Sequence, residues 1–362
     1  MIPMGMSTTS RTATSPQIPT RKRVRLFGNY GKILGGLLAA AVGDAMGAAT
    51  ETRSTAQIIE RFGGLVKDFI TPPDDVFARG FAKGSVTDDF SLAYCTALAI
   101  LDNEGKVTDE VAKNALINWS RTPYYVLAGP TTIKAVERML GHEVEEKQSF
   151  IKYDSSKGSD GGAMKISPVG LLSGGNVDKA IEDAITICRP THFNSTALSG
   201  ACAVAAAVAE ALNENATVDS VIEAGMKGAL KGETVAKEAG KELANPSVYK
   251  RIALAVEIAK KCNGDMGKAM QELADIIGAG LSASETVPCA FGILKAAEGD
   301  TMRTIIAGVN IGNDTDTVAT IAAAMAGTLE SFYNEDYLKL INEVNSYDLE
   351  DTARRIAQVS NG

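Results

Sequence analysis

The chain has 362 residues, of which 45% are hydrophobic, and its 36 lysines and arginines against 44 aspartates and glutamates give a formal net charge of −8. This length and apolar content suffice for a large buried core. The chain lacks the excess of basic residues typical of nucleic-acid-binding proteins, so we expect no direct nucleic-acid partner. No apolar run is long enough to span a membrane, and the richest one, 197–212, predicts a buried helix because Ser199 and Glu210 interrupt it.

Residues 1–28 are rich in serine, threonine, proline and arginine, and the first acidic residue of the chain is Asp44. We expect this segment to be a disordered extension. Its composition also fits an organelle transit peptide or an upstream start codon, and these interpretations stay open.

The chain contains five cysteines, which are widely spaced and mostly lie in apolar helical sequence: Cys95, Cys188, Cys202, Cys262 and Cys289. None forms a Cys-x-x-Cys pair. The pattern predicts core thiols in a reducing compartment, which favours a cytoplasmic protein.

Helical sequence begins at Tyr30, and residues 33–47 are dense in small residues that let helices approach closely. Asp44 lies within this segment. Glu51 follows a glycine and a short polar stretch, so we expect it in a loop, where a solvated acid is the simplest interpretation. A loop over 70–86 then leads to Thr87, which precedes an apolar helix over 88–101, and a further helix is predicted from residue 108 to 119.

The middle of the chain is richest in glycine. Gly129 lies in a predicted loop with Pro130, and the polar segment 153–165 contains Ser159, Asp160, Gly161 and Gly162. Glycines let backbone amides approach a ligand closely, as in a phosphate-binding loop, although an ordinary flexible turn explains them equally well. The segment does not end in the Gly-Lys-Ser/Thr sequence of a Walker loop.

Composition and helical spacing predict further helices over 177–188, 194–212, 218–230, 234–244, 247–262, 266–277, 284–297 and 301–309. The segment 148–153 is the only short strand candidate. We therefore predict an all-α, single-domain protein over residues 29–362.

Two acidic motifs stand before apolar helices more than two hundred residues apart. The first contains Thr87, Asp88 and Asp89, and the second contains Asp314, Asp316 and Thr317. Each alone is an ordinary helix N-terminus. If they met in space, however, they would offer four carboxylates and two hydroxyls, an oxygen-only set suited to magnesium, calcium or manganese. Two divalent cations would balance the four negative charges, which otherwise repel one another.

The chain has only two histidines. His142 lies in a charged stretch and receives no role. His192 ends a loop before a predicted buried helix, where it either binds a ligand or supports the structure. No serine or cysteine has a histidine close in sequence, so the chain shows no sign of a nucleophilic triad.

In order along the chain, these motifs resemble those of the ADP-ribosylglycohydrolase family over residues 30–332. The matching segments are Gly43-Asp44-Ala45-Met46-Gly47 with Glu51, Val86-Thr87-Asp88-Asp89, Ser159-Asp160-Gly161-Gly162-Ala163-Met164-Lys165, Thr191-His192 and Gly312-Asn313-Asp314-Thr315-Asp316-Thr317. The segment Ala283-Ser284-Glu285-Thr286-Val287-Pro288 also looks like one common in bacterial members.

The resemblance implies an orthogonal helical bundle with two magnesium ions, or manganese, in a central cleft. The implied metal ligands are Thr87, Asp88, Asp89, Asp314, Asp316 and Thr317. Glu51, Asp88 and Asp316 would be catalytic. The implied substrate-binding residues are Gly129, Ser159, Asp160, Gly161, Gly162, Met164 and His192, with ADP-ribose or an ADP-ribosylated protein as the partner.

Three departures from the family pattern concern Phe90, where threonine is frequent, and Asp160 and Lys165, where asparagine and arginine are frequent. The last two lie in the substrate loop and put the identity of the substrate in question. Three hypotheses remain: a magnesium-dependent hydrolase of ADP-ribosyl groups, a hydrolase of free nucleosides or related N-ribosides, and a non-enzymatic crystallin-like or ligand-sensing protein. The complete set of six implied metal ligands argues against the third.

Overall fold

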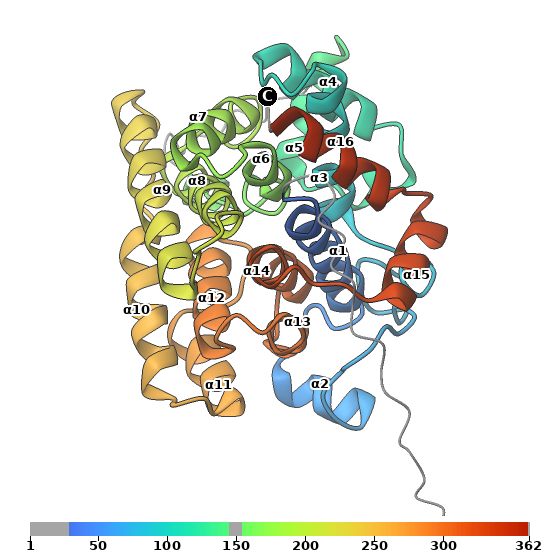
Figure 1. The fold of residues 1–362 in the computed structure, drawn as a ribbon, viewed down its shortest axis with the longest axis vertical. Coiled ribbons are helices and arrows are strands. Elements are labelled where there is room, and N and C mark those ends of the chain that lie inside the picture. Colours follow the sequence, from blue (N-terminus) through green and yellow to red (C-terminus); the bar gives the residue numbers. More distant parts are fainter. Residues whose placement is uncertain (1–28, 145–153, 361–362) are drawn as a thin grey trace, which may run out of the picture.

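Helices joined by short loops make up the computed structural model, which describes residues 29–144 and 154–360 (Figure 1). Across these residues the structure contains no strand, and the β pairing is limited to isolated bridges between Ser54 and Gly312 and between Ser159 and Ser282. The all-α prediction is confirmed. The strand candidate 148–153 and the predicted disordered segment 1–28 lie outside the described residues.

The α-helices are α1 (Tyr30–Gly47), α2 (Thr55–Phe62), α3 (Asp88–Asp102), α4 (Asp109–Trp119), α5 (Pro130–Met139), α6 (Ser167–Leu172), α7 (Val177–Cys188), α8 (Ser195–Ala211), α9 (Val218–Glu238), α10 (Val248–Lys261), α11 (Met266–Ile276), α12 (Ala283–Ala296), α13 (Thr301–Asn310), α14 (Thr315–Glu330), α15 (Glu335–Asn345) and α16 (Leu349–Ser360). Two short 3₁₀ helices, η1 (Pro123–Leu127) and η2 (Ser155–Lys157), lie between them. The helices α2, α5, α6, α15 and α16 were not among those predicted.

Polar residues fix where several predicted helices begin. The Thr87 hydroxyl accepts a hydrogen bond from the Asp89 amide at the start of α3, and Thr108 does the same for Val111 at the start of α4. These bonds satisfy backbone donors that the first helical turn leaves without partners. The sequence signals at these two starts were therefore sufficient to place them.

The prediction of separate helices over 218–230 and 234–244 was wrong, because α9 continues unbroken to Glu238. Gly232 falls at the expected break, and its role is packing. A Cβ on this residue would lie 2.5 Å from the Leu198 carbonyl oxygen of α8. The glycine therefore lets α9 lie directly against α8, and this contact outweighs the low helix propensity of glycine.

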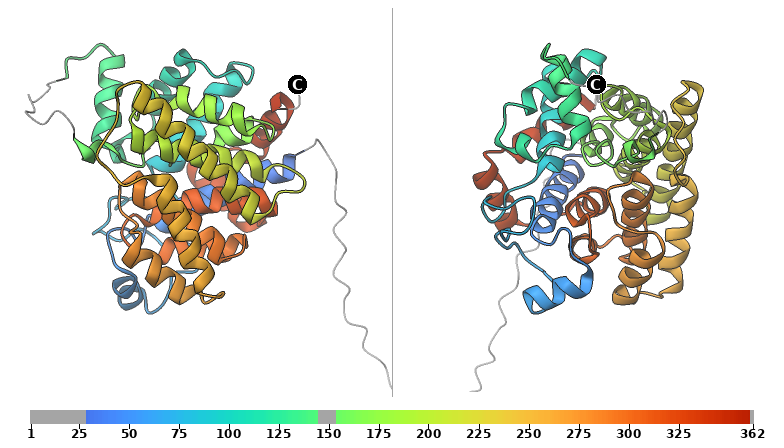
Figure 2. Two further views of the ribbon diagram at one scale, coloured as in Figure 1. Left: turned by 90° about the vertical axis from the view of Figure 1, so that its left-hand side faces the viewer. Right: turned by 180° about the vertical axis from the view of Figure 1, so that it is seen from behind.

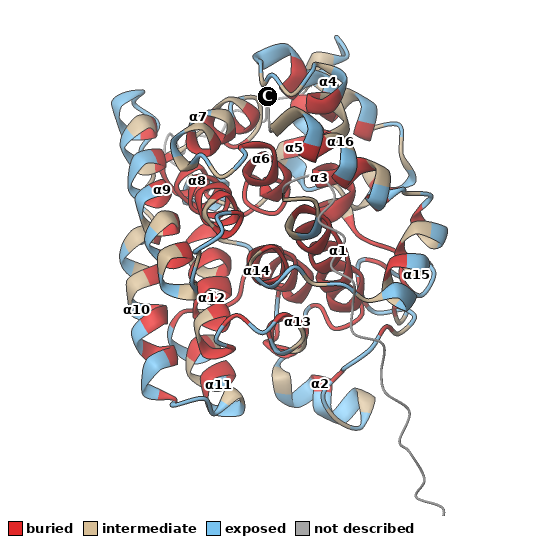
Figure 3. Cartoon of the chain, viewed as in Figure 1, coloured by how far each residue is buried: buried red, intermediate tan, exposed pale blue. Residues whose placement is uncertain are grey.

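The helices α1 and α14 lie side by side at the centre of the molecule and are buried along most of their length (Figures 1 and 3). Glycines on α1 allow this close contact. A Cβ on Gly43 would lie 2.7 Å from the Ala319 carbonyl oxygen, and one on Gly47 would lie 2.5 Å from the Asp316 Cα. The backbone that carries Asp44 is therefore held against the backbone that carries Asp316.

The other helices surround this central pair. The helix α8 is buried along almost its whole length, as predicted. The helix α9 covers it from the outside, and α10 packs mainly against α12 (Figures 2 and 3). The exposed outer faces of α9 and α10 contrast with the buried centre in Figure 3. Four of the cysteines are buried, Cys95 is partly buried, and all five are free thiols. In the described part of the chain, no helix combines the length and apolar character needed to cross a membrane.

We expect Gly47→Ala to lower the free energy of unfolding by about 1–3 kcal/mol, because the added methyl group has no space between α1 and α14. Gly267→Ala is a matched control, since Gly267 is an exposed glycine of α11 and its new Cβ would lie 3.6 Å from the Asp265 Oδ1 atom, an ordinary contact distance. This control should change stability by less than about 1 kcal/mol. Urea unfolding measures both. Equal stability of the two variants would show that the contact at Gly47 tolerates a side chain.

Candidate active site

Asp44 joins α1 to the first acidic motif. Its Oδ2 atom accepts hydrogen bonds from the amides of Thr87 (3.0 Å) and Phe90 (2.9 Å) at the start of α3. The residue is fully buried, and its Oδ1 atom has no hydrogen-bond partner in the described chain. Burial, followed by the nearby charge of Asp316, raises the pKa of Asp44 to about 7. Asp44 therefore orients the Thr87 motif and adds a further carboxyl group beside it.

The turn after α1 is joined to the loop before α14. The Thr52 amide donates to the Asn313 carbonyl and the Asn313 amide donates to the Arg53 carbonyl, each over 2.8 Å. Glu51 lies in this turn, as predicted, but it is buried, so the interpretation as a solvated acid was wrong. Its carboxyl group lies beside that of Asp316, and burial, followed by the charge of Asp316 and other neighbouring acids, raises the pKa of Glu51 well above its usual range.

The two distant acidic motifs meet at the starts of α3 and α14. The Thr317 hydroxyl lies close enough to the Asp89 carboxyl group to influence its pKa. Burial and then the charge of Asp316 raise the pKa of both Asp88 and Asp89. The structure thus brings together the residues that the sequence places more than two hundred positions apart.

The loop before Thr87 is held by a residue from the C-terminal part of the chain. The Asn345 side chain, at the end of α15, accepts hydrogen bonds from the Val86 amide (3.0 Å) and the Tyr124 hydroxyl (2.7 Å). It also donates to the carbonyls of Gly84 (3.0 Å) and Ile341 (2.8 Å). All four hydrogen-bonding positions of the amide are used, so Asn345 acts as a clamp on this loop.

The glycine-rich loop reaches the same centre. The Asp160 amide donates to the Leu281 carbonyl (3.1 Å), which holds the loop to the segment before α12. The Thr286 hydroxyl lies 2.6 Å from the Asp160 Oδ2 atom and also beside the Gly280 carbonyl, and its single proton is shared between these two acceptors. The Asp160 carboxyl group lies beside that of Asp314, and burial is the main cause that raises its pKa to about 6.

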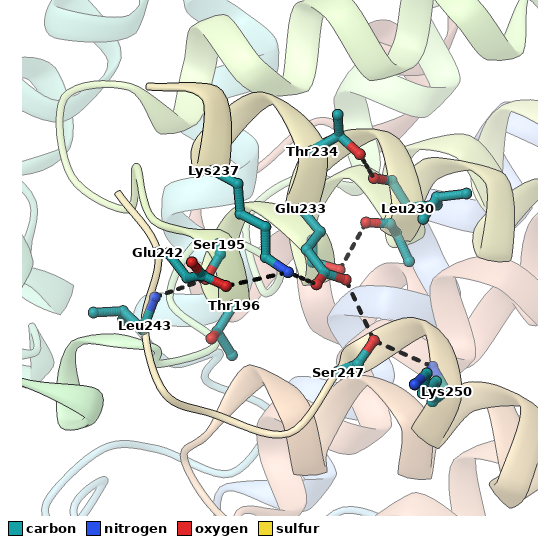
Figure 4. A network of polar contacts seen from close by, with 12 residues as sticks. Ser195, Thr196, Leu230, Glu233, Thr234, Lys237, Glu242, Leu243, Ser247 and Lys250 are labelled. Carbon is teal, nitrogen blue, oxygen red and sulfur yellow. Dashed lines mark hydrogen bonds and ion pairs between the residues drawn. The ribbon is translucent and has the colours of Figure 1, made fainter. Parts of the chain in front are cut away.

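A polar surface is formed by α8, α9, the chain that follows α9 and the start of α10 (Figure 4). Ser195 accepts a hydrogen bond from the Leu243 amide (2.9 Å), and Lys237 pairs with Glu233 (2.6 Å) and Glu242 (3.3 Å). A cavity of about 440 Å³ on this surface is lined by none of the clustered carboxylates. This surface is separate from the acidic centre.

We use the term acidic cluster for the carboxyl groups of Asp44, Glu51, Asp88, Asp89, Asp160, Asp314 and Asp316. Among the described residues, no salt bridge involves a member of this cluster. Asp44, Glu51, Asp89, Asp314 and Asp316 each have a buried carboxylate oxygen without a hydrogen-bond partner in that same part of the chain. Buried anions without partners are costly, so the cluster has the composition and unmet bonding capacity of a site for hard cations.

The side chains are not yet arranged as ligands. Over residues 29–144 and 154–360, no group of three or more acid, histidine or cysteine side chains has a geometry that holds a metal ion. The composition of the cluster fits hard cations, but its present geometry does not define the coordination.

The structure separates two of the predicted substrate-binding residues from the acidic cluster. Gly129 is exposed and immediately precedes α5. Met164 is buried in a small hydrophobic cluster with Leu92, Trp119 and Val136, which is a packing role. Ser159 pairs with Ser282 in an isolated bridge and helps to hold the glycine-rich loop.

His192 lies against the glycine-rich loop. Its ring is buried, and a Cβ on Gly161 would lie 2.7 Å from the His192 Nε2 atom. The Nδ1 atom is 2.8 Å from the Thr191 hydroxyl. Burial, together with the nearby Lys165, lowers the pKa of His192 to about 3, so its imidazole is neutral. His142, by contrast, is exposed beside Glu137.

Sequence reasoning assigned no role to Asp44 and Thr286, although both were part of quoted motifs. Asp44 is a carboxylate in a helix of small apolar residues, and this contrast was the available signal. Thr286 contacts Asp160 across 126 positions of sequence, and no local pattern indicates that contact.

The comparisons with known proteins agree with this arrangement. The family model described as ADP-ribosylglycohydrolase matches residues 28–361. The chain belongs to the ADP-ribosylglycohydrolase family. The match includes α15 and α16, beyond residue 332, where the resemblance in sequence motifs ended.

Two relatives and a solved structure extend the comparison. The chain is 29% identical over 330 residues to the uncharacterized protein YegU of Escherichia coli K12, covering 90% of this chain and 96% of YegU. It is 28% identical over 292 residues to an uncharacterized protein of Archaeoglobus fulgidus, covering 80% and 85%. A structure described as an ADP-ribosylglycohydrolase-related protein complex has a TM-score of 0.63 at 21% identity, with 92% and 99% coverage, which shows the shared fold. Membership of the ADP-ribosylglycohydrolase family indicates a glycohydrolase of ADP-ribose-type substrates.

Without divalent cations, we expect the stability of the protein to fall as the pH rises. The folded protein holds protons on acids whose pKa is raised, such as Asp44 at about 7, whereas in the unfolded chain the same acids lose them near pH 4. Above pH 4 the folded state therefore binds more protons than the unfolded state, and the free energy of unfolding decreases as the pH rises. Each acid with a raised pKa contributes a decrease of about 1.4 kcal/mol per pH unit, until the pH exceeds its pKa in the folded protein. The lowered pKa of His192 makes the free energy of unfolding increase with pH, but only below about pH 6.5.

Urea unfolding between about pH 6.5 and 8 in the presence of a chelator tests this expectation, because His192 no longer contributes there. Magnesium in excess should remove the loss of stability, since cations favour the ionised carboxylates. Asp89→Asn should reduce the pH dependence in the chelator, because it removes one of the raised groups. A free energy of unfolding that is constant with pH and unaffected by magnesium would contradict the proposed character of the acidic cluster.

Proposed function

We propose that the protein is a magnesium-dependent hydrolase that cleaves the glycosidic bond at the anomeric carbon of ADP-ribose attached to a protein side chain or a small acceptor. The observation that carries this proposal is the acidic cluster itself. Carboxyl groups from four separate segments converge in the buried centre, and five of them keep an oxygen without a partner in the described chain. A fold that brings buried acids together at this cost has a functional reason to do so.

The residues that would hold two divalent cations are Thr87, Asp88, Asp89, Asp314, Asp316 and Thr317. The four aspartates carry the charge that two such ions balance. When bound, the ions would supply Lewis-acid contacts to ribose hydroxyls and a water molecule of lowered pKa. Manganese has the same preference for oxygen ligands and is an alternative to magnesium.

Glu51 is the residue best suited to accept a proton from the attacking water. Its Oε2 atom is buried and has no hydrogen-bond partner among the described residues. Negative neighbours, led by Asp316, contribute to its raised pKa, so positive charge among them would bring the pKa of Glu51 down towards the range of a general base.

The glycine-rich loop is suited to hold the diphosphate of ADP-ribose. In the described chain, the amides of Gly161 and Gly162 make no backbone hydrogen bond, so both donors are free for a ligand. His192 adds a neutral ring beside them. The start of α14 also contributes the positive end of a helix dipole, so the negative charge of the protein need not exclude an anionic substrate.

A hydrolase of free nucleosides or N-ribosides is the second candidate, and Asp160 favours it. This carboxyl group lies in the loop that would hold the diphosphate, beside that of Asp314. An additional acid at this position opposes a doubly charged ligand more than a neutral nucleoside. The two candidates share the same cations and the same anomeric chemistry and differ in the substrate.

We expect Asp316→Asn to reduce release of ADP-ribose from a modified protein by more than about a hundredfold, because it removes a proposed cation ligand. Asp336→Asn, at an exposed position in the first turn of α15, should retain activity. Calorimetry with ADP-ribose should show binding with magnesium and weaker binding with a chelator. Hydrolysis of nucleosides without any release of ADP-ribose would favour the second candidate, and loss of activity in both variants would point to a general effect of charge.

A further inference from the structure

Lys165 is a buried lysine without an acidic partner. Its side chain is 1% exposed, and the Nζ atom donates a hydrogen bond to the Thr191 hydroxyl over 3.1 Å. In the described chain it forms no salt bridge, and the titratable groups around it are the Cys188 thiol and the His192 ring. Burying a cation against neutral groups is costly. The position of Lys165 therefore calls for an explanation other than stability.

The hydrogen bonds of Lys165, Thr191 and His192 have a defined direction. A lysine ammonium group only donates, so the Thr191 oxygen must accept from Lys165. The Thr191 hydroxyl has a single proton, and among its hydrogen-bond partners in the described chain the His192 Nδ1 atom, at 2.8 Å, is the one that can accept it. The arrangement that gives this proton an acceptor leaves Nδ1 unprotonated. The proton of the neutral imidazole is consequently on Nε2.

The Nε2 atom faces the glycine-rich loop. A Cβ on Gly161 would lie 2.7 Å from it, so the absence of a side chain at Gly161 gives the ring its space. The amides of Gly161 and Gly162 are free of backbone hydrogen bonds, and the preceding residue, Asp160, reaches Asp314 in the acidic cluster. An N–H group at Nε2 therefore stands beside two backbone donors at the edge of the proposed active site.

We propose that Lys165 and Thr191 are positioning residues that hold His192 as the Nε2–H tautomer, so that it donates a neutral hydrogen bond to an acceptor oxygen of the substrate. The acceptor is a ribose hydroxyl or a phosphate oxygen, and this choice of ligand rests on the proposed function. Lys165 also helps to keep the imidazole neutral, because burial of the ring and the positive charge of Lys165 lower the pKa of His192 to about 3. His192 therefore stays a donor of fixed charge at neutral pH.

An uncharged Lys165 would allow the other tautomer of His192. If Lys165 were an uncharged amine, the Thr191 hydroxyl would donate to it and accept a hydrogen bond from Nδ1–H. Nε2 would then be unprotonated and unable to donate to a substrate. The tautomer of His192 thus distinguishes the proposed arrangement from one in which the three residues only fill space.

Nitrogen NMR of the full chain measures this tautomer directly. The chain contains only two histidines, and His142→Gln leaves His192 as the single imidazole. His142 is exposed and away from the site, so this background should retain activity. At neutral pH we expect a protonated Nε2 and an unprotonated Nδ1. A protonated Nδ1 with an unprotonated Nε2 would overturn the proposal.

Paired variants separate the positioning role from packing. Thr191→Val removes the hydroxyl and Lys165→Met removes the ammonium group, and both should yield a mixture of tautomers. Thr191→Ser and Lys165→Arg keep a hydroxyl and a donor-only cation, so they should restore the Nε2–H form. Lys165→Met should melt at or above the temperature of the parent protein, because it removes a buried charge. Unchanged tautomers in Thr191→Val and Lys165→Met would show that neither residue sets the state of His192.

Calorimetry with ADP-ribose in the presence of magnesium links the tautomer to binding. We expect Thr191→Val to weaken binding about three- to tenfold, as for the loss of one neutral hydrogen bond, and Thr191→Ser to remain within about twofold of the parent. If the parent protein shows the Nε2–H form but no binding of ADP-ribose, the proposed function fails and the positioning role stands. If it binds ADP-ribose with Nε2 unprotonated, only the positioning role fails.

Discussion

The close contact between α1 and α14 is the constraint on which the site depends. Glycines at positions 43 and 47 remove the side chains that would keep the two backbones apart, and the Asp316 Cα lies where a side chain of residue 47 would begin. The turn that follows α1 is hydrogen-bonded to the loop that precedes α14. As a result, Asp44, Glu51 and Asp316 cannot move apart without opening the core. The apolar packing of small residues holds like charges together.

This arrangement makes the electrostatics of the centre a property of the fold. The acids of the cluster are buried, repel one another and have no basic partner among the described residues. Bound protons or bound cations reduce the repulsion among these carboxylates, and the two compete for the same oxygens. Proton binding, cation binding and folding are therefore linked in this protein. The buried Lys165 donates a hydrogen bond to Thr191 and, among the described residues, forms no salt bridge with the cluster.

Local features of the sequence were sufficient for most of the helices, since capping residues such as Thr87 and Thr108 mark their starts. They were also sufficient to group Asp88, Asp89, Asp314 and Asp316, because each motif repeats a hydroxyl and two acids before an apolar helix. Long-range contacts were not predictable in this way. Gly232 suggests a helix break in the sequence, but in the structure it allows α8 to pack against α9. Met164 belongs to the motif of the glycine-rich loop, but its side chain packs in a hydrophobic cluster. The roles of the site residues stay predictions, whereas their convergence is observed.

The clamp formed by Asn345 has a consequence for the order in which the protein matures. Asn345 follows every other residue of the site in sequence, yet it holds the loop that leads into Thr87. During synthesis the first acidic motif therefore emerges long before the residue that orients it. A growing chain passes through a stage in which the early carboxylates are present but the support of Asn345 is still missing, and the acidic cluster is assembled only when the late helices dock.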